Sequence, residues 1–405
     1  MRTKNDIIRI MIKNTLEIFM RIHTVKASES LKDIAQEYGI DEDILKINNG
    51  IGDDAPAEGE ELLILTPTRT YITERGDTPE RLALRFGVRR CDIMAMNPWI
   101  EAEGLTPGRR IALKYDERIY GTAASNGYFF SGTKLSEVKE RLPYLTYVTV
   151  ASAVAEGGEI RSLFNDRDVQ GLVRSADKIP LIRIFIKDAS CFYGDEEGFA
   201  DRMVRHALSG GYKGVTLGSA TSIPSDFLMM LRKKMIGCDL ILITEAESES
   251  PESLSELSDG TVFSAHGYLS GNTLPFAEGD ARQYEGYAVN RESSKAFIEL
   301  PTLAVTDGGY VSVKEAYERA RRGGCQIETD RDTLLSSFEH KRRGKHVFPS
   351  LRNIKAILTA LHEYGFMGIS FDIARTPISF LMMYNSLFGT TTYTSVRSRE
   401  GCSKE

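Results

Sequence analysis

Hydrophobic and polar residues follow the same order twice in the first part of the chain. Residues 22–49 and 70–98 each begin with a short alternating segment and continue with two stretches whose apolar residues recur at helical spacing. A second apolar segment closes each copy after a glycine turn, at Gly59 and at Gly108. The pattern predicts a strand–helix–helix–strand module that is present twice.

Capping residues support this prediction. Ser28 and Thr78 are residue types that cap helix N-termini, and each precedes the first helical stretch of its copy. We therefore expect one module over residues 20–67 and a second over residues 68–115.

From residue 116 onward, short β-branched runs alternate with amphipathic helical stretches, which is typical of parallel β/α units. The expected strands lie at 121–130, 144–153, 179–186, 212–220, 238–246, 261–268, 294–304 and 365–373. Eight units over residues 116–391 predict a (β/α)8 TIM barrel, so the chain as a whole is assigned to the α/β class.

The two ends of the chain carry no such pattern. Residues 1–19 are basic and moderately apolar, but charged residues interrupt them and no small-residue cleavage pattern follows. We expect a poorly ordered extension there, with an amphipathic surface helix as the alternative, and a polar tail at 392–405. We predict no signal peptide and synthesis in the cytoplasm.

Composition and charge narrow the range of partners. The net charge of −6 and the pI near 5.7 argue against nucleic acid or an anionic membrane as the main partner. No apolar run is long enough to predict a membrane span. The five cysteines stand singly, which predicts neither a zinc site nor a disulfide framework, and we expect no metal or cofactor.

Short motifs in the repeated module match a known family. The second copy carries Gly-Asp-Thr at 76–78, Asn97-Pro98 and Pro-Gly-Arg-Arg-Ile at 107–111; the first copy has Ser-Glu-Ser at 28–30 and Asn-Asn at 48–49 instead. The module resembles the LysM domain over residues 22–114. That resemblance implies binding of glycans that contain N-acetylglucosamine, such as peptidoglycan or chitin, in a groove between two loops.

By the same resemblance, the groove residues of the first copy are Ser28, Glu29, Ser30, Ile47, Asn48 and Asn49, and those of the second are Gly76, Asp77, Thr78, Asn97, Pro98, Trp99 and Ile100. Trp99 is the only tryptophan of the chain, and it either offers a platform for a sugar or covers a small hydrophobic core. Two weak sites in series would gain avidity on a repetitive polymer.

Two such modules ahead of a barrel resemble the spore cortex-lytic glycosidases, whose barrel belongs to glycoside hydrolase family 18. Local matches lie at 143–154, 266–271 and 360–371, and the resemblance covers about residues 20–390. In that family, strand 4 carries Asp-Gly and then acids at alternating positions, ending in the glutamate that protonates the glycosidic oxygen.

The strand-4 acids of that family are missing here. Lys213 stands at the position of the first aspartate, and the inward positions hold Thr216, Gly218 and Ala220. A polar stretch of strand 6 reads Phe-Ser-Ala at 263–265, and the position of the strand-8 tryptophan holds aspartate. The resemblance therefore implies a barrel without the reaction of its family.

Other carboxylates could replace the missing acids, because active sites of such barrels lie at the C-terminal ends of the strands. Asp188, Glu245 and Asp372 are expected there, either as substitutes or as helix caps and rim residues. His266 is interpreted as a rim or packing residue.

We arrive at two hypotheses. The first is a peptidoglycan-binding protein that is made in the mother cell and deposited on the spore cortex or coat. Its inactive barrel would act as a scaffold or glycan-binding platform, with other coat or cortex proteins as further candidate partners. The alternative is an active peptidoglycan N-acetylglucosaminidase that uses carboxylates outside the family pattern.

Overall fold

The computed structural model describes residues 20–115, 120–219, 222–246, 253–264, 284, 287–288 and 292–390. The chain divides into two compact units. Within the described residues, the first unit takes the chain up to Thr122 together with Thr302–Ala356 and Arg375–Gly389, and the second takes Ala123–Pro301 and Ile357–Ala374.

The first repeat consists of β1 (Met20–Thr24), α2 (Leu31–Tyr38), α3 (Glu42–Asn49) and β2 (Glu61–Leu65), and β1 pairs antiparallel with β2. Ile34, Leu45 and Leu62 are fully buried in its core. The expected cap at Ser28 is wrong. Ser30 caps α2 by accepting a hydrogen bond from the backbone N–H of Asp33, whereas Ser28 lies in a left-handed turn with φ of +61°.

The second repeat has the same order: β3 (Arg69–Ile72), α4 (Pro79–Phe86), α5 (Arg90–Met96), the short helix α6 (Ile100–Glu103) and β4 (Arg110–Lys114). Thr78 caps α4 as predicted, since its side chain accepts from the N–H of Arg81. Helix α6 has no counterpart in the first repeat and was not predicted.

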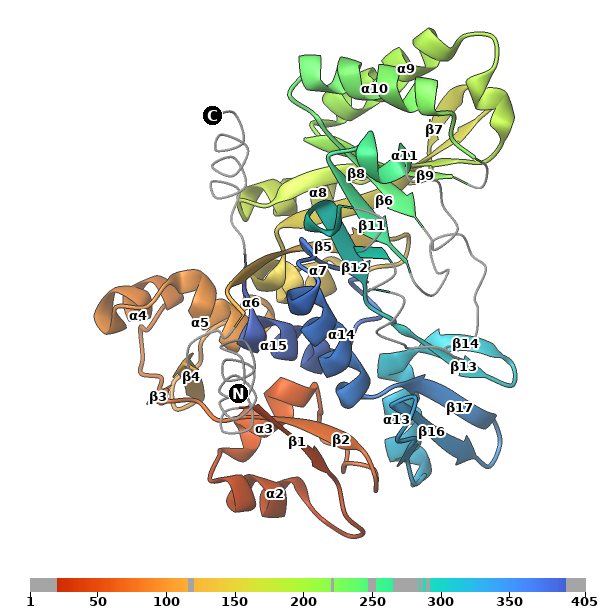
Figure 1. Ribbon diagram of the computed structural model, residues 1–405. Helices are drawn as coiled ribbons and strands as arrows, with labels where there is room; N and C mark the ends of the chain where they lie inside the picture. Colours follow the sequence, from red (N-terminus) through yellow and green to blue (C-terminus); the bar gives the residue numbers. More distant parts are fainter. Residues whose placement is uncertain are drawn as a thin grey trace, which may run out of the picture. The chain divides into compact units, whose positions relative to one another are not determined.

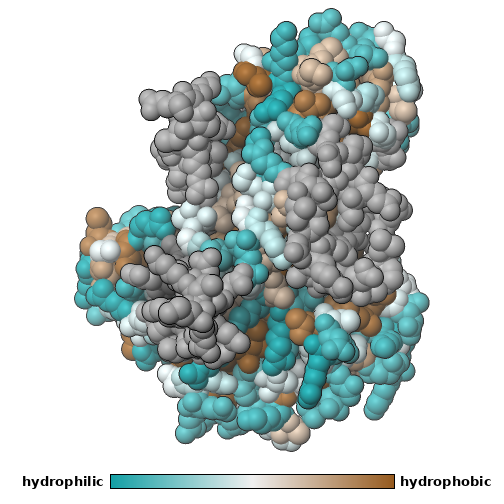
Figure 2. All heavy atoms as spheres, viewed as in Figure 1, coloured by the Kyte–Doolittle hydropathy of each residue, from teal (hydrophilic) through white to brown (hydrophobic). Residues whose placement is uncertain are grey.

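A second, unpredicted sheet completes the first unit. It is formed by β13 (Leu303–Thr306), β14 (Gly309–Ser312), β15 (Glu328–Thr329), β16 (Leu335–His340) and β17 (Gly344–Pro349), in the order β14-β13-β17-β16-β15 with antiparallel pairings. Helix α13 (Val313–Gly323) packs on it. The surface over this sheet in Figure 2 is mainly hydrophilic. Helix α15 (Ile378–Leu387) also belongs to this unit.

The second unit is a closed barrel, as predicted (Figure 1). Its eight parallel strands are β5 (Thr122–Phe129), β6 (Tyr147–Glu156), β8 (Ile179–Ile186), β9 (Gly214–Ser219), β10 (Ile241–Ala246), β11 (Gly260–Phe263), β12 (Ala296–Glu299) and β18 (Gly368–Asp372). Each pairs with its neighbour, and β5 pairs with both β6 and β18, which closes the ring. The predicted strand at 294–304 is two strands, since β12 lies in the barrel and β13 in the other sheet.

Helices follow the barrel strands, among them α7 (Leu135–Arg141), α8 (Arg167–Ser175), α9 (Glu196–Gly210), α10 (Ser225–Gly237), α11 (Ser253–Glu256) and α14 (Leu351–Glu363). The short strand β7 (Glu159–Ser162) extends β6 as a hairpin, and the 3-10 turn η2 (Ala189–Phe192) follows β8. Alternate strand residues point into the lumen, where Tyr147, Leu181, Ile243 and Phe297 form an apolar floor.

Candidate functional site

Above this apolar floor, three strands contribute a buried polar cluster. Arg183 on β8 donates from Nε and Nη2 to the two carboxylate oxygens of Glu245 on β10, at 2.7 Å each. The hydroxyl of Tyr128 on β5 donates to Oε1 of the same glutamate at 2.9 Å. The side chains of Arg183 and Glu245 are only 11% and 6% exposed. A bidentate ion pair therefore lies inside the barrel.

The glycine on β9 makes room for this ion pair. A Cβ atom added at Gly218 would overlap Oε2 of Glu245 and would lie 2.7 Å from Nη2 of Arg183. The carboxylate of Glu245 thus enters the space that a side chain at position 218 would occupy. By the resemblance to family 18, position 218 is one of those at which strand 4 was expected to carry an acid.

The other strand-4 positions carry no acid. Thr216 is fully buried, and its hydroxyl lies 3.2 Å from that of Thr149, which donates to Oδ1 of Asn126 at 2.8 Å. Lys213 is exposed just before β9. Ala220 and His266 lie outside the described residues.

The surroundings of the cluster favour a charged Arg183 and a protonated Tyr128. Burial alone would lower the pKa of Arg183, but the attraction of Glu245 outweighs burial and raises it. Burial and then the charge of Glu245 raise the pKa of Tyr128 well above 10, so its hydroxyl stays a donor. Glu299 on β12 adds a second buried carboxyl, whose charge acts on both Tyr128 and Arg183.

The other two candidate acids, Asp188 and Asp372, lie at the boundaries of secondary-structure elements. Asp188 caps η2 by accepting from the N–H of Ser190 at 3.0 Å, and the hydroxyl of Ser190 is the main cause of its lowered pKa. Asp372 ends β18 opposite Tyr128 in the strand register, and it accepts from the N–H of Ala374 at 2.9 Å. Of the three predicted acids, Glu245 is the one that the described contacts place in the polar cluster.

Among the described residues, no group of three or more histidine, cysteine, aspartate or glutamate side chains is arranged to hold a metal ion. No described helix is long and apolar enough to cross a membrane.

In the repeats, one buried asparagine holds each closing strand. The amide of Asn97 donates to the carbonyl oxygens of Ile93 and Ala112, and its Oδ1 accepts from the N–H of Ala112. Asn49 makes the same three bonds in the first copy, to Leu45 and Leu63. Asn49 is therefore the counterpart of Asn97, one position later than the motif comparison suggested.

Both copies build the loop before the first helix in the same way. Oε2 of Glu29 accepts from the N–H of Lys26 at 2.8 Å, and Oδ2 of Asp77 accepts from the N–H of Glu74 at 2.7 Å. Ser28 and Gly76 both have positive φ, and Ser30 and Thr78 are both N-caps. The loop residues predicted for the two grooves therefore have matching backbones.

The second predicted loops are more deeply buried. Asn48, Asn49 and Asn97 are at most 8% exposed, and Ile100 is 5% exposed. Trp99 is 6% exposed, packs in the core of the second repeat, and has the guanidinium of Arg109 over its ring at 3.4 Å from the centroid. These contacts favour the alternative in which Trp99 covers the core.

Sequence reasoning missed Arg183, Tyr128 and Arg109. A signal for Arg183 exists, because it is the only charged residue in the apolar run Ile-Pro-Leu-Ile-Arg-Ile-Phe-Ile at 179–186, and a buried charge requires a partner. Its partner lies 62 positions later in the sequence, which no local pattern reveals.

Comparisons with known proteins agree with this architecture. The family model of the LysM domain matches residues 23–64 and 71–114, so the two repeats are LysM domains. A search of curated proteins gives no match.

Among solved structures, the spore cortex-lytic enzymes SleL of Bacillus megaterium and of Bacillus cereus are both similar, with TM-scores of 0.69 and 17% identity. Each similarity covers 92% of this chain and 99% of the other. A family GH18 chitinase from Cycas revoluta has a TM-score of 0.55 at 14% identity, and the match covers 65% of this chain and 99% of the chitinase. At these identities the similarity concerns the fold.

Proposed function

We propose that this protein binds peptidoglycan of the bacterial spore cortex through its LysM modules, and that its barrel acts as a scaffold without hydrolysing the glycan. The two LysM matches carry the binding part of the proposal. The likeness to two spore cortex-lytic enzymes along nearly the whole chain supports the choice of the cortex. We further propose synthesis in the mother cell and deposition beside other cortex or coat proteins.

The arrangement around Gly218 carries the proposal of inactivity. A general acid must hold a proton and deliver it to the glycosidic oxygen, which contributes about 10²–10⁴-fold to the rate. Here the carboxylate in the strand-4 space accepts hydrogen bonds on both oxygens from a guanidinium and one from a tyrosine. Glu245 is therefore engaged as an ion-pair partner.

Binding is tested with the full chain. We expect the purified protein to be retained on insoluble peptidoglycan at low salt and to pass through cellulose, which lacks acetamido groups. Equal retention on both polymers, or on neither, would contradict a LysM-based function.

A second candidate function rests on the same glutamate. Because Glu245 lies in the space of a strand-4 acid, an active N-acetylglucosaminidase would use this residue. The test is release of reducing ends from peptidoglycan by the wild-type chain, by Glu245→Gln and by a control variant, Asp168→Asn, at an exposed position of α8. We expect no release from any of them. If the wild type and the control variant released reducing ends and Glu245→Gln did not, the alternative would be established.

A further inference from the structure

The two LysM modules differ systematically in charge. Equivalent backbone hydrogen bonds show which residues correspond. The N–H of Val25 donates to the carbonyl oxygen of Glu60, and the N–H of Thr73 donates to the carbonyl oxygen of Arg109. Glu60 thus corresponds to Arg109, and Asp33 on α2 to Arg81 on α4. Residues 23–64 contain eleven acidic and three basic residues, whereas residues 71–114 contain six acidic and eight basic ones.

The turn before the closing strand of the first module is docked within the chain. A Cβ atom added at Gly59 would overlap the carbonyl oxygen of Ile327 and would lie 2.9 Å from the carbonyl carbon of that residue. The N–H of Ile327 donates to the carbonyl of Glu58 at 2.8 Å. Glu60 pairs with Arg321 of α13, with side chains only 2% and 6% exposed.

The neighbouring parts of the first module are docked as well. Glu61 is fully buried and pairs with Arg352. At the loop after α3, a Cβ at Gly50 would lie 2.7 Å from Cγ2 of Ile378 on α15. The turn before the closing strand and the end of the predicted groove loop at 47–50 are therefore in contact with other parts of the same chain.

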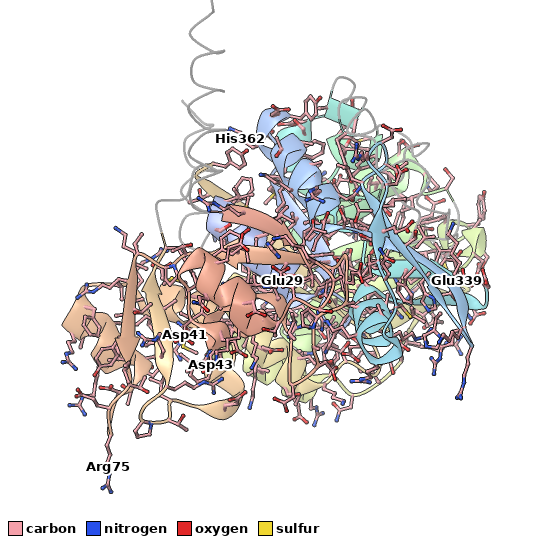
Figure 3. The ribbon with its side chains drawn as sticks, turned by 90° about the horizontal axis from the view of Figure 1, so that it is seen from below. Glu29, Asp41, Asp43, Arg75, Glu339 and His362 are labelled. Atoms are coloured by element: carbon pink, nitrogen blue, oxygen red, sulfur yellow. The ribbon has the colours of Figure 1, made fainter. Side chains whose placement is uncertain are left out.

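The equivalent turn of the second module is open. A Cβ at Gly108 would meet nothing within 4 Å. Arg81 donates to the carbonyl of Gly76 at 2.9 Å, and Arg109 lies over Trp99 and pairs with Glu103. Arg75 projects outward from the second module (Figure 3). We call these three arginines the arginine rim: Arg81 contacts the loop at 76–78, Arg109 contacts the loop at 97–100, and Arg75 directly precedes the first of these loops.

We infer that the second module makes the glycan contact and that its arginine rim recognises carboxylates carried by the glycan. This inference rests on the proposed function. Guanidinium groups match carboxylates in geometry and charge. Peptidoglycan carries carboxylates on its peptides, whereas chitin is neutral, so the rim predicts a preference between two polymers that share N-acetylglucosamine.

The experiment uses the full chain and three insoluble polymers: peptidoglycan, the same peptidoglycan with its carboxyl groups amidated, and chitin. The rim variant is Arg75→Gln/Arg81→Gln. The control variant, Arg89→Gln/Lys114→Gln, removes the same charge from the same module. Arg89 follows the far end of α4, about 12 Å from Thr78 along the helix, and Lys114 ends β4 away from the turn. Circular dichroism checks that each variant is folded.

We expect the rim variant to bind native peptidoglycan about three- to tenfold more weakly at low salt, with chitin binding unchanged. The wild type should bind amidated peptidoglycan as weakly as the rim variant binds the native polymer. Equal losses in the rim and control variants, or equal wild-type binding to native and amidated peptidoglycan, would overturn the inference while leaving LysM binding in place. If the wild type bound none of the three polymers, the result would instead contradict the proposed function.

Discussion

The two LysM modules share a backbone and differ in what they contact. Each has one buried asparagine across the closing strand, a matching loop before the first helix and a glycine in the same turn. In the first module, acidic residues of that turn are buried against arginines of the same chain. In the second, arginines of that turn remain partly exposed. A duplicated module has thus kept its fold while the charge and the contacts of the same turn differ between the copies.

The largest expected effect on stability comes from the ion pairs of the two turns, at Glu60 and at Arg109. Glu60→Gln leaves the buried Arg321 without its charge partner, and we expect the free energy of unfolding to fall by about 3–5 kcal/mol. Arg109→Gln breaks a partly exposed pair with Glu103 and removes the guanidinium from the ring of Trp99, and we expect a loss of about 1–2 kcal/mol. Urea unfolding measures both. A double-mutant cycle with Arg321→Gln checks the cause, and negligible coupling would refute the docked turn.

A second pair of variants tests what the modules have in common. Asn49→Ala and Asn97→Ala each leave buried backbone groups of a closing strand without partners, so both should cost about 2–3 kcal/mol. Fluorescence of Trp99, the only tryptophan, reports on the second module. A large effect in one copy and none in the other would show that the modules are not equivalent in their cores.

A third pair uses matched glycines. Gly59 and Gly108 have φ of +77° and +84°, so alanine strains the backbone similarly at both positions. Only Gly59→Ala also collides with Ile327, and we expect it to destabilise by about 1–2 kcal/mol more than Gly108→Ala. Equal melting temperatures for the two variants would argue against the contact.

The smallest effect concerns pH. Burial alone would raise the pKa of Glu29, but the N–H of Lys26 and the side chain of His23 outweigh burial and lower it. Because the folded pKa lies below the unfolded one, this contribution is present above the unfolded pKa and is lost as the pH falls through the folded value. Glu29→Gln should therefore show a shallower fall in melting temperature between pH 6 and pH 3 than the wild type. Parallel curves would contradict this.

Elements with a strong local period could be predicted from the sequence. The two modules and all eight barrel strands follow from apolar spacing, because that spacing reflects which face is buried. The boundary between β12 and β13 was missed because the segment 294–304 was interpreted as one strand, although residues 300–302, with Pro301 among them, separate the two strands. The cap at Ser30 was missed because Ser28 is the same residue type two positions earlier.

The candidate site was predictable only in part. The missing acids at Thr216 and Gly218 are visible in the sequence, as is the presence of Glu245 at a strand end. The ion pair with Arg183 joins β8 to β10 across the intervening strand β9, an arrangement that exists only in the folded barrel. The docking of Glu60 likewise depends on a residue more than 250 positions away.

The glycine at position 218 also constrains how this barrel could change over generations. A Cβ atom at position 218 would meet the ends of the Glu245 and Arg183 side chains, so a larger residue there requires both side chains to shift. The ion pair that they form would then have to change its geometry. Substitutions at position 218 are therefore coupled to residues 183 and 245, and we expect the three positions to vary together.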